Sequence, residues 1–360
     1  MATVRSYSGP LLALASAALF GASTPLAKRL LGDGVDPGLL AGLLYLGSGL
    51  GLGVLTLAQR LSGAPHAEAP LTRRDLPWLA LTVASGGVVG PLLLMIGLAR
   101  TPASSAALLL NVEGLATMGI AWVVFRENVD RRLLAGAAAI LAGALLLSWR
   151  GAPGSTGLGL GAVAIVGACL AWGVDNNLTR KLSAADPAQI AMIKGLVAGA
   201  VNVALAMARG AALPASLRVA EAGVVGFLGY GVSLALFVLA LRHLGAARTG
   251  AYFSTAPFIG AVLAIALFRD PVTAPLVAAA ALMGVGVWLH LTERHEHEHD
   301  HEALEHSHAH VHDAHHQHQH GPGDPATEPH VHPHRHGPLA HSHPHYPDLH
   351  HRHGHGHSHG

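Results

Sequence analysis

Long apolar stretches follow one another along residues 10–291 of the 360-residue chain, separated only by short loops. A helix needs roughly 20 mostly apolar residues to cross a bilayer, and each stretch approaches or exceeds that length. Only 12% of the residues are charged, about half the share of roughly 25% in soluble domains. The sequence therefore predicts an all-α integral membrane protein with ten transmembrane helices. The predicted spans are residues 10–30, 38–59, 76–99, 103–125, 132–149, 158–179, 188–208, 219–241, 246–268 and 273–291.

Glycine is frequent within these stretches, most densely in "GSGLGLG" at residues 47–53. This run lacks the spacing of a dinucleotide-binding loop and follows no predicted strand. In lipid, small residues allow helix backbones to approach closely. We therefore expect this run to pack against a neighbouring helix rather than to bind phosphate.

An even number of spans places both termini on the same side of the membrane. More Lys and Arg residues flank the spans on that side than on the other. Because cytoplasmic loops carry the excess of Lys and Arg, both termini are expected to be cytoplasmic.

The chain contains an internal repeat of five helices. "LFGASTPLAKRL" at 19–30 aligns with "AWGVDNNLTRKL" at 171–182, and "VVFRENV" at 123–129 aligns with "IALFRDPV" at 265–272. With an odd number of helices, the second copy must be inverted in the membrane relative to the first. Inverted repeats place a binding site near the midplane and move it by alternating access.

The aligned motifs, together with "LLLNVEGLATMGIAWVVFRENVDRRLLAGAAAILAGALLL" at 108–147, resemble the EamA-type permeases of the drug/metabolite transporter (DMT) superfamily. The resemblance implies a multi-pass carrier for small molecules in the inner (plasma) membrane. It divides the chain into a first five-helix repeat at 1–150, a second at 151–292 and a tail at 293–360. One departure is Glu113-Gly114, where the family often has Glu-Pro, whereas Pro257 is kept in the second repeat.

Three ionisable residues stand out inside the predicted spans, where charges are costly and usually face a cavity or a partner: Asp175, Lys194 and Glu113. Asp175 and Lys194 fall at similar depths on adjacent helices, which predicts an ion pair or a shared site. The alternative is that Asp175 and Asn176 cap backbone at the membrane interface. Glu113 lies near the midplane, where it is expected either to bind substrate or a coupling proton, or to be a protonated structural acid.

Neutral polar residues complete the candidate translocation site. Asn111, Asn176, Asn177, Asn202 and Tyr252 are expected to offer hydrogen bonds to a cavity, although such residues often join helices instead.

The tail after Arg294 contains all but three of the 28 histidines, and the three others are His66, His243 and His290. With few aliphatic residues it is expected to be disordered. Neutral imidazole binds Zn, Ni and Co, so the tail is expected to bind these divalent ions although no cofactor is required. The candidate ligands are His295, His297, His299, His301, His306, His308, His310, His312, His315, His316, His318 and His320.

No enzyme is expected. His295 to His299 match H-E-x-x-H, but here the pattern arises from alternating His and Glu in a low-complexity segment.

Three functions are compatible with these features. The first is transport of a small organic metabolite or drug-like solute, which the bundle favours because few carboxylate or imidazole ligands converge in it. The second is transport of Ni, Co or Zn, which the tail would collect or deliver. The third is a membrane-anchored metal sensor or store. The expected partners are the solute, the bilayer and divalent ions, with no nucleic acid, and a homodimer is left open.

Overall fold

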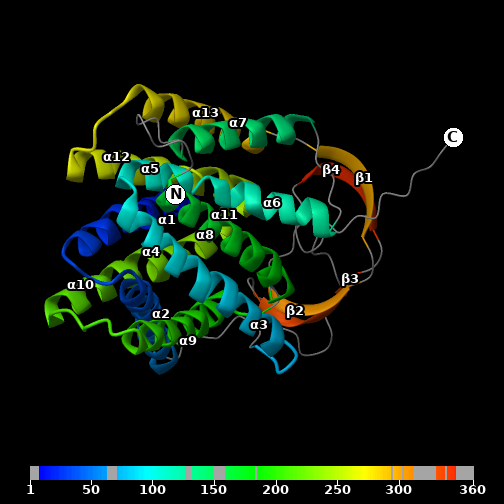
Figure 1. The fold of residues 1–360 in the computed structure, drawn as a ribbon. Coiled ribbons are helices and arrows are strands. Elements are labelled where there is room, and N and C mark those ends of the chain that lie inside the picture. The colour runs from blue at the N-terminus through cyan, green and yellow to red at the C-terminus, as the bar shows by residue number, and fades with distance from the viewer. Residues whose placement is uncertain are drawn as a thin grey trace.

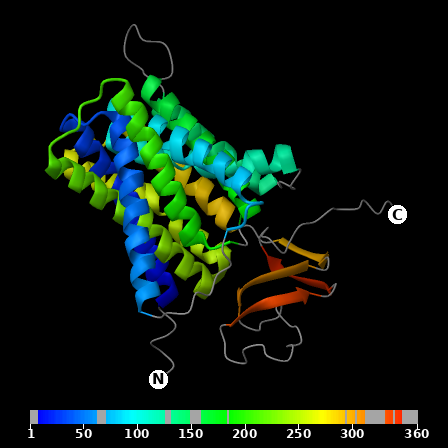
Figure 2. The same cartoon turned by 90° about the horizontal axis from the view of Figure 1, so that it is seen from below.

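The computed structural model describes residues 8–62, 71–125, 131–148, 159–182, 185–292, 295–301, 304–310, 330–336 and 339–345. Its helices form one bundle, and four strands of the tail lie beside that bundle in both views (Figures 1 and 2).

The first repeat supplies eight elements to the bundle. They are α1 (Ser8–Gly32), α2 (Pro37–Leu61), α3 (Leu76–Thr82), the π-helix η1 (Val83–Val89), α4 (Gly90–Arg100), α5 (Ala103–Leu109), α6 (Val112–Phe125) and α7 (Arg131–Ser148).

The second repeat has a similar order of elements, except that one continuous helix takes the place of the two helices α4 and α5. Its elements are α8 (Leu160–Thr179), the 3₁₀ turn η2 (Arg180–Leu182), α9 (Pro187–Ala208), α10 (Ser216–Gly226), the π-helix η3 (Phe227–Val232), α11 (Ser233–Phe253), α12 (Ala256–Phe268) and α13 (Ala274–Leu291).

The predicted membrane spans are found in the described chain, with one correction. Nine helical stretches among the described residues are long and apolar enough to cross a membrane, and the remaining predicted span contains the shorter apolar helix Ala256–Phe268. The prediction of a loop near 242–245 and a continuous helix over 246–268 is wrong. Helix α11 continues through the expected loop, because this stretch contains no proline and is rich in good helix formers. The chain breaks instead between α11 and α12.

The two repeats pack with approximate two-fold symmetry. Helices α2 and α9 lie side by side, as do α7 and α13, so each helix contacts its own counterpart (Figure 1). Helix α1 packs on α11 and α12, and its counterpart α8 packs on α4 and α6. This exchange of partners confirms that the chain is built from two equivalent five-helix units.

Close backbone contacts explain the aligned and clustered glycines. Gly21 of α1 lies against the Ala256 carbonyl at the start of α12, and the aligned Gly173 of α8 lies against Ala116 of α6, with no room for a Cβ at either glycine. Gly47 of the glycine-rich run packs against α10 in the same way. These glycines allow the close helix packing that the sequence predicts.

The tail contains strands where the sequence predicts disorder. Strands β1 (His295–His301) and β4 (Leu339–His345) pair antiparallel, as do β2 (Leu304–His310) and β3 (His330–His336). Alternation of histidine with other residues has the two-residue period of a strand, which accounts for the difference. Five of the predicted metal ligands lie outside the described residues: His312, His315, His316, His318 and His320.

Candidate functional site

One membrane helix of each repeat is broken within the bilayer. Between α5 and α6, the side-chain amide of Asn111 donates a hydrogen bond to the Leu108 carbonyl over 2.8 Å. Between α11 and α12, the Thr255 hydroxyl donates to the Tyr252 carbonyl over 2.6 Å. Short polar side chains that bond local backbone compete with the helical ladder, and Pro257 near the start of α12 has no N–H to continue it. The two breaks occupy corresponding positions in the repeats.

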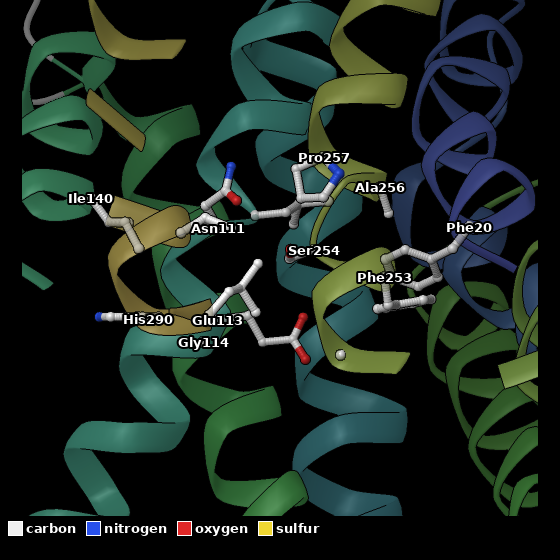
Figure 3. Close-up of a pocket in the computed structure, with 14 residues that line it drawn as sticks. Phe20, Asn111, Glu113, Gly114, Ile140, Phe253, Ser254, Ala256, Pro257 and His290 are labelled. Atoms are coloured by element: carbon white, nitrogen blue, oxygen red, sulfur yellow. The ribbon is translucent and has the colours of Figure 1, made fainter. Parts of the chain in front are cut away.

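A cavity of about 280 Å³ lies between the two breaks (Figure 3). Its lining is mostly apolar, and its polar side chains are those of Asn111, Glu113, Ser254 and His290. The lining residues are Phe20, Leu110, Asn111, Glu113, Gly114, Ile140, Gly250, Phe253, Ser254, Ala256, Pro257, Val287, His290 and Leu291.

Glu113 is the acidic residue of this cavity. It lies in the first turn of α6, where the positive end of a helix dipole favours a negative group. One carboxyl oxygen accepts a hydrogen bond from the Asn176 amide over 3.0 Å, and the same amide lies 3.1 Å from the Thr117 hydroxyl. Within the described chain Glu113 takes part in no ion pair, so its interactions here are with neutral groups.

Asp175 and Lys194 form a buried ion pair between α8 and α9. The Lys194 ammonium contacts one carboxylate oxygen of Asp175, and the two side chains are 17% and 7% exposed, respectively. The other carboxylate oxygen accepts a hydrogen bond from Thr179 over 3.3 Å. Asp175 is therefore paired with Lys194 inside the bundle, and it does not cap backbone at the interface.

The ion pair lies beside the π-helix η1. The wider turn of a π-helix often marks a functional site, and the Asp175 carboxylate fills the space where a Cβ on Gly86 would be. The Gly86 carbonyl accepts hydrogen bonds from Tyr45 over 2.8 Å and from the Trp172 indole over 3.0 Å. Asn202 donates to the next carbonyl, that of Gly87, over 3.2 Å. Asn202 thus supports η1 and does not line the cavity.

The three adjacent polar residues of α8 have different partners. Asp175 faces Lys194 and η1, whereas Asn176 faces Glu113 and α6. Asn177 donates to the carbonyls of Thr117 and Gly173 over 3.0 and 2.8 Å, so it joins α8 to α6. Helix α8 therefore connects the ion pair to the acid of the cavity.

A chain of aromatic rings runs along the other side of the site. Phe20 and Phe253, which line the cavity, have centroids 5.3 Å apart. Phe20 also contacts Tyr230 at 5.8 Å, and Tyr230 contacts Tyr45 at 5.7 Å. Since Tyr45 binds η1, these rings extend from the cavity to the neighbourhood of the ion pair.

Sequence reasoning identified part of this site. Asn111 and Glu113 line the cavity, but Tyr252 does not, because it precedes the break and its neighbours Phe253 and Ser254 line it instead. His290 was missed as a site residue, although it is the only histidine within a predicted span. Its ring nitrogen Nε2 lies 3.1 Å from the Leu133 carbonyl. Phe20 was missed too, although it directly precedes the aligned Gly21.

The described side chains do not provide a metal site: no group of three or more His, Cys, Asp or Glu residues with suitable placement is found among them. This finding does not extend to the tail histidines, whose side chains are not among the described ones.

Comparisons with known proteins agree with this architecture. Residues 7–149 and 159–292 match the sequence profile of the EamA-like transporter family. An "Uncharacterized transporter" of Methanothermobacter thermautotrophicus is 32% identical over 213 residues, which cover 57% of this chain and 62% of that relative. The match thus spans less than two thirds of the relative's length. A crystal structure of a protein 20% identical to this chain has a similar fold, with a TM-score of 0.57 over 79% of this chain and 95% of the other.

Proposed function

Because the chain belongs to the EamA-like transporter family, we propose that it is a secondary-active carrier of a small organic solute. The observation that carries this proposal is the cavity between two broken helices, one from each inverted repeat. Irregular backbone at membrane depth is tolerated where it lines a cavity or is buried in protein. Broken helices at a repeat interface form the substrate sites of many secondary transporters.

Unequal packing of the broken helices supports alternating access. The first half of one broken helix, α5, packs on the second half of the other, α12. The equivalent contact under the repeat symmetry is between the end of α11 and α6. In the described chain these two elements have no comparable packing, and the cavity is lined by residues of both. One end of the bundle is closed and the other is open, as expected for one state of an alternating-access cycle.

Polar contacts hold the closed end together. The Lys28 ammonium of α1 donates to the carbonyls of Leu98 and Thr101 at the end of α4, over 2.6 and 3.0 Å. The Asp270 carboxylate, which follows α12, accepts hydrogen bonds from the backbone N–H and hydroxyl of Ser104 at the start of α5, over 3.0 and 2.8 Å. We propose that these contacts break when the closed end opens.

The orientation in the membrane is inferred from the excess of Lys and Arg residues on the side of the two termini. We propose that both termini are cytoplasmic in the inner membrane, which places the end with Lys28 and Asp270 outside. The cavity, which reaches His290 and Leu291 at the end of α13, then faces the cytoplasm in this state.

For the tail we propose binding of divalent metal ions. Its alternating histidines supply many interchangeable imidazole ligands, which suit Zn, Ni and Co. In this proposal the tail is an accessory to the carrier and binds metal on the cytoplasmic side.

A second candidate function is transport of the metal ion itself, which the histidine content of the tail favours. The bundle argues against it. Asp175 is already neutralised by Lys194, and Glu113 is the only carboxylate among the described residues that line the cavity. Divalent ions such as Zn require about four converging ligands. We therefore rank the organic solute above the metal.

Two measurements test these proposals. In proteoliposomes preloaded with a mixture of amino acids, amines and carboxylates, wild type should exchange at least one labelled organic solute faster than protein-free liposomes do. No exchange of any solute would contradict the carrier.

In cells, the content of Ni, Co and Zn is compared among wild type, Asp175→Asn and a chain truncated after Arg294, at matched amounts in the membrane. If only truncation changes the metal content, the tail merely binds metal. If Asp175→Asn abolishes the change and truncation only weakens it, the bundle carries metal and the organic-solute proposal is wrong.

A further inference from the structure

The charges around the cavity are unbalanced. Among the described lining residues, Glu113 is the only acid, and none is Lys or Arg. Lys194 of α9, which packs on η1 outside the cavity, is already paired with Asp175. Of the described lining residues only His290 can carry a positive charge, so an anionic solute would meet a carboxyl group and at most one imidazolium, whereas a cationic solute would meet an acid without a described ionic partner.

The walls beside Glu113 are aromatic. Figure 3 shows the carboxyl group of Glu113 facing the part of the cavity that Phe253 and Phe20 border. The two rings are tilted at 44° to each other with centroids 5.3 Å apart, and Phe237 supports Phe253 from behind at 4.9 Å. Aromatic faces attract cations electrostatically, most strongly where water is excluded.

The remaining lining limits the size and polarity of the solute. The cavity of about 280 Å³ is slightly smaller than the roughly 300–1,000 Å³ typical of small-molecule pockets. Leu110, Ile140 and Val287 offer no hydrogen bonds. A sugar or another highly hydroxylated solute would lose more hydrogen bonds to water than this wall can replace.

We infer that the cavity binds a small organic cation, an ammonium group on an apolar body. The ammonium lies at Glu113 and displaces the Asn176 amide from its carboxyl oxygen. The body lies against Phe20, Phe253 and the aliphatic wall. This inference rests on the proposed carrier function and names the solute class of the same cavity.

The test compares three probes that share a phenyl ring and a short linker. The cation is labelled trimethyl(2-phenylethyl)ammonium, which cannot lose its charge; the neutral probe is 2-phenylethanol and the anion is 3-phenylpropanoate. Binding to the purified full-length protein is measured by equilibrium dialysis. We expect the cation to bind at least tenfold more tightly than the other two, because only the cation is attracted electrostatically by the Glu113 carboxylate and by the faces of the aromatic rings.

Variants test whether the cation binds in this cavity. Glu113→Gln removes the charge attraction and should weaken cation binding by about tenfold or more, Glu113→Asp should retain part of it, and Phe253→Leu, which removes a ring face, should weaken it severalfold. Glu221→Gln removes an acid of α10 that pairs with Arg218 outside the cavity, and it should bind the cation like wild type. Thermal unfolding of each variant identifies any that are misfolded, and Glu113→Asp keeps the test valid if Glu113→Gln is one of them.

Equal binding of the three probes, no binding of the cation, or cation binding that survives Glu113→Gln would overturn the inference. Exchange in proteoliposomes separates this failure from that of the carrier. If amino acids or carboxylates exchange and the cation does not, the carrier function stands and the solute class is wrong. If no solute exchanges, the carrier function itself is wrong.

Discussion

At the scale of single residues, two acids on neighbouring helices have different environments and therefore different roles. Asp175 is buried with a cationic partner in Lys194. Glu113 faces a cavity and has a neutral partner in Asn176. A paired charge in the membrane is costly to separate, whereas an unpaired carboxyl is free to exchange partners. We therefore assign Asp175 and Lys194 to the framework that positions α8 against α9 and η1, and Glu113 to contact with the solute.

The ion pair gives a prediction at this scale. Asp175→Asn leaves the Lys194 ammonium buried without its carboxylate, and breaking a buried pair in this way costs about 3–5 kcal/mol. The thermal unfolding midpoint in detergent should therefore fall clearly below that of wild type. In the double variant Asp175→Asn/Lys194→Gln no charge is left uncompensated, so most of the loss should be recovered. Equal midpoints for wild type and the single variant would show that the pair does not stabilise the bundle.

At the scale of elements, the breaks between α5 and α6 and between α11 and α12 let each half helix move separately. Asn111 and Thr255 hold local carbonyls at these breaks, and the packing of the half helices differs between the two repeats. Hinges absorb changes of backbone dihedral angles at a few positions. A continuous helix would couple the closed end to the open end and prevent one from moving without the other.

Repairing a break should slow transport without unfolding the protein. In Asn111→Leu the amide that competes for the Leu108 carbonyl is absent, and α5 and α6 are expected to join. We expect solute exchange in proteoliposomes to fall severalfold while the unfolding midpoint stays equal or rises. Asn111→Ser, which keeps a short polar side chain, should exchange solute faster than Asn111→Leu. Loss of exchange with a lower midpoint in both would indicate a structural role instead.

At the scale of the whole molecule, we propose that two charged groups hold the closed end of the bundle. Lys28 of the first repeat binds the end of α4, and Asp270 of the second repeat binds the start of α5. The open end contains the cavity and the end of α13. Since hydrogen bonds to charged groups contribute about 1.5–3 kcal/mol each, a few such contacts are enough to shift the population between the two states.

Removing one of these contacts should open the closed end. In a Cys169→Ser background, Ala107→Cys reports on α5, where Ala107 is 1% exposed and packs against α12. Lys28→Met should raise its labelling by a membrane-impermeant maleimide added outside by roughly tenfold. Arg29→Met, which removes an exposed neighbouring charge, is the control and should label as slowly as the parent. Unchanged labelling in Lys28→Met would contradict the assignment of Lys28 to the closed end.

The tail gives a second prediction for the molecule as a whole. Equilibrium dialysis should show several Ni ions bound per wild-type chain at neutral pH and few after truncation at Arg294. Binding should weaken as the pH falls through about 6.5, because protons compete for the imidazole nitrogens. Solute exchange should persist in the truncated chain, since the cavity is built from the bundle alone. If the truncated chain still bound Ni to the same extent, the metal site would lie in the bundle and not in the tail.

The sequence predicted the fold well because length and hydropathy fix membrane helices and the repeat fixes their symmetry. It also paired Asp175 with Lys194, because their depths can be counted along two adjacent helices. It missed His290 and Phe20, whose places in the cavity depend on how α13 and α1 are rotated. It misplaced the end of α11, since a short polar segment at a membrane edge is consistent with either a loop or a helix.

The sequence by itself determined that the chain crosses the membrane in two inverted repeats, because each apolar stretch must satisfy its backbone hydrogen bonds internally as a helix. Only the tertiary structure decided what each buried polar side chain faces. Adjacent residues on α8 point about 100° apart around the helix axis, so Asp175 meets Lys194 while Asn176 meets Glu113. Which end we propose to be closed was also decided by packing, because the repeats share a sequence pattern, whereas the packing of α5 on α12 is seen only in the structure.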